Sequence, residues 1–245
     1  MLIAFEGGEG AGKSSQISRL ADTVRTAGRT VVVTHEPGAT LLGRQIRRLL
    51  LDSDEPISPR AEALLFAADR SQHVATVIRP ALERGEVVIT DRFVDSSLAY
   101  QGAGRTLPPE EVKRLSRWAT EDLVPDLTVL LDVPAEVGLA RARRRQDGTA
   151  AAAAGNSGLD RLEREALDFH ERVRAGYRAL AEAEPDRYLV LDGRRPLDEL
   201  AADVATRVLA MLVVSGGAPA PGRTPGTAGP ERHEAAEHDV AEAGR

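Results

Sequence analysis

The sequence predicts an α/β fold in which a five-stranded parallel sheet carries helices on both faces. Two observations lead to this prediction. Short apolar runs rich in β-branched residues alternate along the chain with longer segments of helical periodicity. The 245 residues, of which 42% are hydrophobic, are also enough for one such domain with a sizeable core.

Each element is expected where one of these two patterns occurs. The strands are expected at residues 2–5, 30–34, 87–90, 127–132 and 188–191. The helices are expected at about residues 11–27, 40–51, 59–84, 108–123, 135–145, 159–183 and 197–214.

The first strand is a short apolar run, and the helix after it places Ile17, Leu20 and Val24 on one face. The third strand is an apolar run that ends in an acid, Asp91. The last helix closes with the apolar residues 209–214, which are too few for the ~20 residues that span a bilayer.

Two segments interrupt the alternation. Residues 146–158 are mostly small, which indicates a mobile loop, although the five alanines within them favour a longer helix as the alternative. From Ser215 onward the chain is rich in Gly, Pro, Ala and Glu, a composition typical of disorder. We therefore expect a domain at residues 1–214 and a disordered tail at 215–245.

The composition excludes several classes of protein. The chain has no cysteine, so disulfides and thiolate metal sites are excluded. A net charge of −6 argues against non-specific binding of nucleic acid. Because it has neither a basic N-terminal region nor a membrane-spanning apolar stretch, we expect a cytoplasmic protein without a membrane partner.

Residues 7–14 carry the pattern G-x-x-x-x-G-K-[ST], which is typical of a phosphate-binding loop between a strand and a helix. Its backbone N–H groups and the helix N-terminus attract phosphate oxygens. Lys13 is expected at the β- and γ-phosphates and the Ser14 hydroxyl at Mg²⁺. A glycine-rich turn that matches by chance is the alternative, which the flanking strand and helix disfavour. The residues expected to bind the nucleotide are Gly7, Gly8, Glu9, Gly10, Ala11, Gly12, Lys13, Ser14 and Ser15.

The third strand brings Asp91 and Arg92 to the carboxyl edge of the sheet, where ligands of open α/β sheets bind. Asp91 is expected to order Mg²⁺ or its waters, with a helix N-cap as the alternative. Arg92 is placed to meet a second phosphate. Glu9 would repel phosphates, so we expect its carboxylate to face a metal-bound water or a hydroxyl instead.

Arginines flank the small-residue segment 146–158. They are Arg141, Arg143, Arg144 and Arg145 before it and Arg161 and Arg164 after it. On a mobile lid at about residues 141–161, such arginines would neutralise charge in the transition state of phosphoryl transfer, an effect worth ~10³–10⁵ in rate. A solvated helix face in an arginine-rich chain is an equally favoured alternative.

Phe66 and Arg70 lie one helical turn apart and share a face. Such a pair can hold a base by stacking and hydrogen bonding. An aromatic residue at helical spacing is more often part of the core, and the residues alone favour that interpretation for Phe66.

Six segments within residues 1–212 resemble the bacterial thymidylate kinases, in the order and at the spacing of that family. They read FEGGEGAGKS (5–14), EPG (36–38), ALLFAADR (63–70), DRFVDSSLAYQG (91–102), PDLT (125–128) and LDRLE (159–163). The resemblance implies a P-loop nucleoside monophosphate kinase fold. It also implies transfer of the γ-phosphoryl group of ATP to dTMP, giving dTDP for dTTP synthesis, with Mg²⁺ as cofactor.

The resemblance implies a role for each matching residue. Phe66 would stack on thymine, Arg70 would bond the base edge, and Tyr100 would lie under the deoxyribose. The residues implied to bind dTMP are Glu36, Arg47, Phe66, Arg70, Arg92, Ser97, Tyr100 and Gln101. Those implied to be catalytic are Glu9, Lys13, Arg92 and Arg145, and those at the metal are Ser14 and Asp91.

Residues 8–11 of the phosphate loop include no basic residue, whereas the predicted lid is rich in arginine. The chain thus resembles the class of the family in which a lid arginine, here Arg145, serves catalysis. The resemblance also implies a homodimer through helices on one face of the sheet. The alternatives are a kinase for another nucleotide or nucleoside and a GTP-binding switch, although the switch's Asn-Lys-x-Asp motif is absent. A partner-binding tail remains a third possibility, less favoured than a dispensable one.

Overall fold

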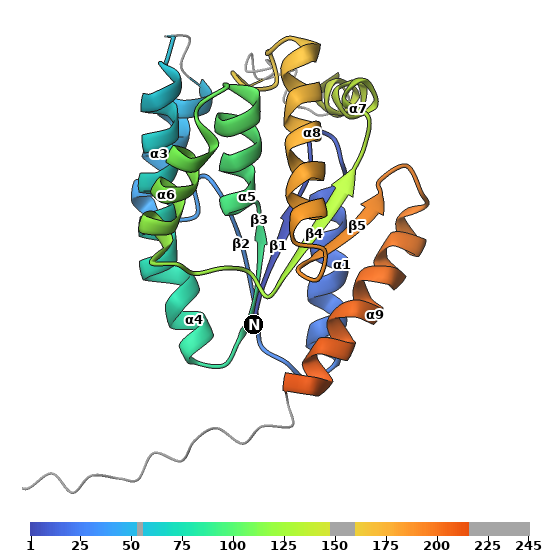
Figure 1. Ribbon diagram of the computed structural model, residues 1–245. Helices are drawn as coiled ribbons and strands as arrows, with labels where there is room; N and C mark the ends of the chain where they lie inside the picture. The colour runs from blue at the N-terminus through green and yellow to red at the C-terminus, as the bar shows by residue number, and fades with distance from the viewer. Residues whose placement is uncertain (53–55, 148–159, 216–245) are drawn as a thin grey trace, which may run out of the picture.

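The computed structural model describes residues 1–52, 56–147 and 160–215, without the side chains of residues 145–147 and 215. Five parallel strands form one sheet in the order β2-β3-β1-β4-β5 (Figure 1). They are β1 (Leu2–Glu6), β2 (Val31–His35), β3 (Val87–Asp91), β4 (Leu127–Asp132) and β5 (Tyr188–Asp192). The predicted five-stranded parallel sheet is confirmed, and every strand begins within one residue of its predicted position.

Helices fill the connections between the strands. They are α1 (Lys13–Thr26), α2 (Leu41–Arg47), α3 (Pro59–His73), α4 (Arg79–Glu83), α5 (Val94–Ser97), α6 (Pro109–Thr120), α7 (Ala135–Asp147), α8 (Leu167–Ala183) and α9 (Leu197–Ser215). Three further segments are π-helical, namely η1 (Arg48–Asp52), η2 (Val74–Ile78) and η3 (Leu98–Gly104). Because η2 joins α3 to α4 without a gap, the predicted helix at 59–84 is a single helical stretch.

Side chains alternate between two faces along each strand, and both faces are buried. On β1, Ile3 and Phe5 pack against α1 and α9, whereas Leu2 and Ala4 pack against η2 and α4. On β4, Leu130 packs with η3 and α8. Figure 1 shows α5 and α8 in front of the sheet and α1 behind it. Helices on both faces are therefore confirmed.

The structure corrects two expectations about helices. The predicted helix at 159–183 begins only at Leu167, because Asp160 Oδ1 accepts the backbone N–H groups of Leu162 at 2.9 Å and Glu163 at 2.8 Å. Such a side-chain bond holds a turn in place of a helix. Residues 94–104, for which no element is expected from the sequence, form α5 and η3.

The register of the sheet aligns the carboxyl ends of its central strands. Phe5 of β1 lies opposite Asp91 of β3, which in turn lies opposite His35 of β2. The loops that follow β1, β2 and β3 therefore leave the sheet side by side, and residues far apart in the sequence meet there.

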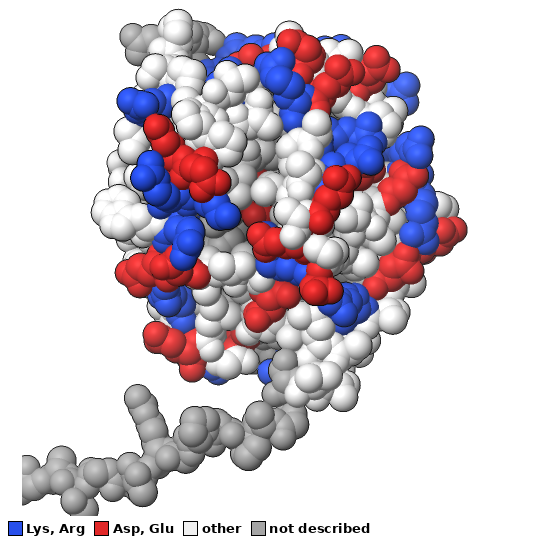
Figure 2. Space-filling view, in the orientation of Figure 1, with Lys and Arg blue, Asp and Glu red and all other residues white. Residues whose placement is uncertain are grey.

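The division into a domain, a lid and a tail stays a prediction. Residues 148–159 of the expected lid and residues 216–245 of the expected tail lie outside the described residues. No helix among the described residues is long and apolar enough to cross a membrane. Figure 2 shows acidic and basic side chains interspersed over the visible face, without a continuous basic area on its described part.

Candidate active site

A cleft of about 550 Å³ lies at the carboxyl edge of the sheet, between the loop after β1 and the helices after β2 and β3. Most of the residues predicted for the site line it. They are Glu9, Gly10, Ala11, Gly12, Lys13, Ser14, Ser15, Glu36, Arg47, Phe66, Asp91, Arg92, Ser97, Tyr100 and Gln101. The cleft thus brings the phosphate loop and the predicted acceptor residues into one cavity.

The phosphate loop turns directly into α1, with Gly12 at its N-cap in a left-handed conformation (φ 96°). Lys13 Nζ donates to the carbonyl oxygens of Gly7 and Gly8, both at 3.3 Å, and lies 3.9 Å from Asp91 Oδ1. Burial, followed by the charge of Arg92, lowers the pKa of the Lys13 ammonium, whereas the carboxylates of Asp91 and Glu9 oppose that shift.

The loop packs tightly against α7 at two glycines. A Cβ atom on Gly10 would lie 2.1 Å from the carbonyl oxygen of Gly138, and one on Gly138 would lie 2.2 Å from the carbonyl oxygen of Glu9. Gly10 also has a φ of 63°, which favours glycine. Both positions require glycine, so the shape of the loop depends on α7.

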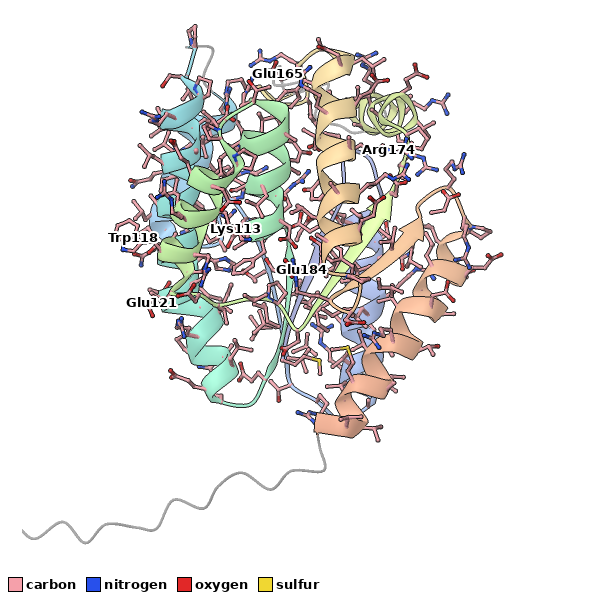
Figure 3. The ribbon with its side chains drawn as sticks, in the orientation of Figure 1. Lys113, Trp118, Glu121, Glu165, Arg174 and Glu184 are labelled. Carbon is pink, nitrogen blue, oxygen red and sulfur yellow. The ribbon has the colours of Figure 1, made fainter. Side chains whose placement is uncertain are left out.

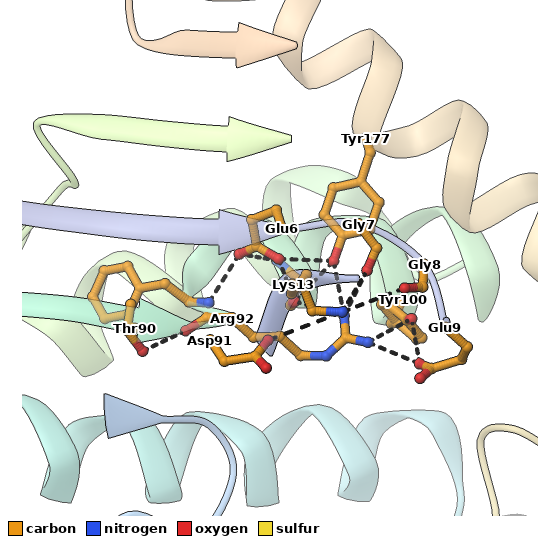
Figure 4. Close-up of polar contacts among 12 residues, drawn as sticks. Glu6, Gly7, Gly8, Glu9, Lys13, Thr90, Asp91, Arg92, Tyr100 and Tyr177 are labelled. Carbon is orange, nitrogen blue, oxygen red and sulfur yellow. Dashed lines mark hydrogen bonds and ion pairs between the residues drawn. The ribbon is translucent and has the colours of Figure 1, made fainter. Parts of the chain in front are cut away.

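Arg92 is the centre of the polar network in the cleft (Figure 4). Its Nη2 atom donates to Glu9 Oε1 at 2.8 Å and to the Tyr100 hydroxyl at 3.1 Å. Its Nη1 atom donates to the Gly7 carbonyl oxygen and the Tyr177 hydroxyl, both at 3.2 Å. The backbone of Arg92 has a φ of 71°, a left-handed conformation that is uncommon for a residue with a side chain. This turn after β3 directs the guanidinium toward the phosphate loop.

Glu9 Oε1 accepts from both Arg92 and the Tyr100 hydroxyl, the latter at 2.7 Å. Burial by itself raises the pKa of Glu9. The charges of Arg92 and Lys13 and the hydrogen bond from Tyr100 outweigh burial and lower that pKa to about 2. Glu9 is therefore ionised throughout the physiological pH range.

Glu6, the last residue of β1, contacts this network through its side chain. It is not among the residues that the sequence predicts for the site. Its Oε1 accepts the backbone N–H groups of Phe93 at 2.8 Å and Ser96 at 3.2 Å. Its Oε2 accepts the hydroxyls of Ser96 at 2.6 Å and Tyr177 at 2.9 Å. Burial, followed by the charge of Asp95, raises the pKa of Glu6 to about 7.

A second buried network lies beneath the end of the cleft farther from the phosphate loop. Arg70 Nε donates to Glu36 Oε2 at 2.7 Å, and its Nη1 and Nη2 atoms donate to Ser97 Oγ and the Phe93 carbonyl oxygen, both at 3.0 Å. Arg70 is buried and does not line the cleft, so its predicted contact with a base edge stays a prediction. Burial by itself raises the pKa of Glu36, but the charges and hydrogen bonds of Arg70 and His73 together outweigh burial and lower that pKa.

Phe66 combines the two roles considered for it. The ring is half-buried and packs against the cluster around η3 and α8, and it also lines the cleft. Arg47 enters from α2 and donates from Nη1 to the Pro37 carbonyl oxygen at 3.0 Å. An aromatic face and a guanidinium thus flank the same cavity.

The N-cap alternative for Asp91 is wrong, because the N-cap of α5 is Phe93 and no side chain caps it. Asp91 Oδ1 is buried without a hydrogen-bond partner, at 3.9 Å from Lys13 Nζ. Ser14 lines the same cleft, and an unsatisfied carboxylate oxygen there fits a Mg²⁺ or its waters. No group of three or more His, Cys, Asp or Glu among the described residues would hold a metal alone, so phosphate oxygens would complete its ligands.

The predicted lid arginines separate in the structure. Arg141 donates from Nη1 to the Gly193 carbonyl oxygen at 2.9 Å. Arg161 bonds the Leu50 carbonyl oxygen at 2.7 Å and Glu62 Oε2 at 2.5 Å, and its closure over a phosphoryl group stays a prediction. The side chain of Arg145 lies outside the described residues, and its catalytic role stays a prediction.

Seven of the described residues that line the cleft were not predicted as site residues. They are His35, Pro37, Leu51, Ser96, Asp160, Leu162 and Glu163. Five of them, all except His35 and Leu51, lie in segments that carry the resemblance, such as LDRLE for the last three. For those five residues the matching segments are the only signal in the sequence.

Comparison with known proteins extends over most of the chain. Residues 5–204 match the model of a family described as "Thymidylate kinase". The thymidylate kinase of Leifsonia xyli is 53% identical over 213 residues, which are 85% of this chain and 94% of that protein. The thymidylate kinase of Clavibacter michiganensis is 50% identical over 218 residues, 89% of this chain and 99% of that protein. The thymidylate kinase of Deinococcus radiodurans is 50% identical over 204 residues, 83% and 94% of the respective chains.

Proposed function

The chain belongs to the thymidylate kinase family, and from this membership we propose that it transfers the γ-phosphoryl group of ATP to dTMP, giving dTDP and ADP. The observation that carries the proposal is the single cleft that joins the phosphate loop to Arg92, Arg47 and Phe66. One cavity of this kind holds two phosphate-binding sites next to an aromatic face. That is the arrangement required by a reaction between a triphosphate and a nucleoside monophosphate.

The donor ATP is assigned to residues 7–15. Lys13 Nζ now bonds the Gly7 and Gly8 carbonyl oxygens, weak acceptors that charged phosphate oxygens would replace. The N-terminus of α1 adds partial positive charge at the same point. Mg²⁺ would be held by Ser14 and Asp91 together with phosphate oxygens, and when bound it neutralises charge on the transferring group.

The acceptor dTMP is assigned to the other end of the cleft. Its phosphate would meet Arg92 and Arg47, and its base would stack on Phe66 between Glu36 and Gln101. The ring of Tyr100, which lies 4.9 Å from the Arg92 guanidinium carbon, would lie under the deoxyribose and disfavour a 2′-hydroxyl. In this arrangement Arg92 and Glu9 stand between the two phosphate groups.

A nucleotide panel tests the substrate. The purified protein is incubated with ATP and dTMP, dUMP, dCMP, dGMP or dAMP, with and without Mg²⁺, and ADP release is followed. Activity that needs Mg²⁺ and is highest with dTMP is expected. A single methyl group gives only ~1–3 kcal/mol of discrimination, so slower turnover of dUMP is also expected. A preference for any base other than thymine would refute the dTMP assignment.

We also propose that the protein is a homodimer. Large apolar side chains are exposed on the neighbouring elements α2, η1, α3 and α6. They are Leu41 (71% exposed), Leu42, Leu49, Leu64 and Trp118 (82% exposed). Figure 3 shows Trp118 projecting outward from α6. Sedimentation is expected to report a dimer for the wild type and a monomer for Trp118→Glu.

We place the enzyme in the cytoplasm, where ATP and dTMP are available. Fractionation of cells that produce the full chain tests this location, and recovery of the activity with the membranes would contradict it.

A further inference from the structure

Glu62 lies on α3, one helical turn before Phe66, and its side chain is fully buried. Four N–H donors converge on its carboxylate. Oε1 accepts from Gln101 Nε2 at 2.9 Å and from Arg105 Nε at 3.2 Å. Oε2 accepts from Arg105 Nη2 at 3.0 Å and from Arg161 Nη2 at 2.5 Å. Glu62 therefore connects the wall of the cleft to two arginines that lie behind it.

This carboxylate is held in its ionised form. Burial raises the pKa of Glu62, but the hydrogen bonds from Arg105, Gln101 and Arg161 outweigh burial and lower that pKa. An ionised carboxylate accepts hydrogen bonds and donates none. The amide group of Gln101 must therefore turn its nitrogen toward Glu62, and a flipped amide would place two acceptor oxygens against each other.

The fixed amide determines what Gln101 offers the cleft. Gln101 lines the cavity together with Phe66, and its Oε1 atom accepts no hydrogen bond from the described residues. With Nε2 bound to Glu62, this carbonyl oxygen is the polar atom that Gln101 presents to a bound base. The wall beside the aromatic ring is thus a hydrogen-bond acceptor.

We propose that Glu62 sets the base preference of the enzyme by holding the Gln101 amide with its oxygen toward the base. Thymine and uracil carry an N–H donor at N3, which that oxygen would accept. Cytosine has an acceptor at N3 and would be repelled. The proposal rests on the proposed function, in which this end of the cleft takes a pyrimidine nucleotide, and it makes Glu62 a positioning residue that touches no substrate.

The test is the variant Glu62→Gln, whose neutral amide can either accept or donate, so that Gln101 is free to turn. The matched control is Glu165→Gln, which removes the other carboxylate partner of Arg105, at 2.6 Å, and leaves the contact between Glu62 and Gln101 intact. Values of kcat/KM are measured for dTMP, dUMP and dCMP. The preference for dTMP over dCMP is expected to fall by about tenfold or more in Glu62→Gln and to be unchanged in Glu165→Gln.

An unchanged preference in Glu62→Gln would overturn the proposal, and so would an equal loss of activity toward all three nucleotides, which a merely structural role would give. A wild-type enzyme that prefers another base would instead contradict the proposed function.

A second measurement needs only the wild type and covers the case in which Glu62→Gln does not fold. The N3-methyl analogue of dTMP has no N3–H donor and keeps both carbonyl oxygens of the base. Calorimetry is expected to show about tenfold weaker binding of this analogue than of dTMP. Equal affinity would overturn the proposal, because no acceptor would then be reading N3–H.

Discussion

Arg92 and Glu9 form an ion pair across the cleft, with Nη2 of Arg92 2.8 Å from Oε1 of Glu9. The Tyr100 hydroxyl bonds the same carboxylate oxygen at 2.7 Å. The pair joins the phosphate loop to the loop after β3. The ion pair orients the Arg92 guanidinium, which is assigned to the acceptor phosphate. It also keeps the Glu9 carboxylate beside that phosphate.

Glu9→Gln keeps the shape of this residue and removes its charge. The Arg92 guanidinium would lose its strongest partner and turn away from the position between the two phosphates. We expect kcat to fall by about 10²-fold, the effect of losing one oriented electrostatic contact, with a smaller change in KM for dTMP. Steady-state kinetics with dTMP varied at saturating ATP measure both. An unchanged kcat with a raised KM would place Glu9 in binding alone.

Lys13→Met removes the buried ammonium and retains most of the side-chain volume. Since Lys13 is assigned to the β- and γ-phosphates, kcat is expected to fall by about 10²–10³-fold. Circular dichroism should show a folded protein, because the Gly7 carbonyl oxygen keeps Arg92 Nη1 as a donor and Gly8 is partly exposed. Turnover within a few-fold of the wild type would refute the role of Lys13.

Glu6→Gln tests the raised pKa of this buried carboxyl. The pKa of Glu6 is about 7 in the folded protein and near its usual value of 4.5 when unfolded, so the folded state binds the extra proton between these values. Its contribution to the free energy of unfolding is therefore fully present below pH 4.5 and is lost as the pH rises through 7, by roughly 3 kcal/mol. The variant should lack this decline in urea titrations at a series of pH values. Parallel pH profiles for variant and wild type would contradict the assignment.

Gly138→Ala tests the contact between α7 and the phosphate loop. The added methyl group would meet the Glu9 carbonyl oxygen, so the loop or the helix must shift. We expect weaker ATP binding and a free energy of unfolding lowered by ~1–3 kcal/mol. Gly102→Ala is the matched control for stability, because a Cβ there meets no atom within 4 Å. Equal ATP affinity in Gly138→Ala and the wild type would show that the loop tolerates the shift.

The sheet could be predicted because its strands are buried on both faces and therefore appear as continuous apolar runs. Residues 94–104 show no such signal, since α5 and η3 expose little and bury polar side chains such as Ser96 and Gln101. α8 begins later than predicted for a local reason, because the side chain of Asp160 bonds the backbone N–H groups of residues close to it in the chain. The periodicity of a sequence does not reveal that a side chain competes with a helix for backbone N–H groups.

The residues of the candidate site also fall into two groups, those that the sequence predicts and those that only the structure reveals. Lys13 and Ser14 belong to a contiguous motif whose chemistry can be inferred from spacing alone. Glu6 and Glu62 act through partners as far away in the chain as Tyr177 and Arg161, so their roles appear only when the fold brings those residues together. The role of a buried acid depends on the groups that donate hydrogen bonds to it. For Glu6 and Glu62 these groups include residues far away in the sequence, so no short stretch of sequence contains the acid together with all its donors.

The left-handed backbone of Arg92 limits how this position can change. A side chain there costs ~1–2 kcal/mol that glycine would avoid, yet glycine has no guanidinium. Replacing the arginine would also leave the Glu9 carboxylate without the cation that it pairs with at 2.8 Å, so the backbone strain is retained together with this ion pair. Searches for thermostable variants should therefore find few substitutions at position 92, because the gain from relaxing the backbone is offset by the loss of this pair.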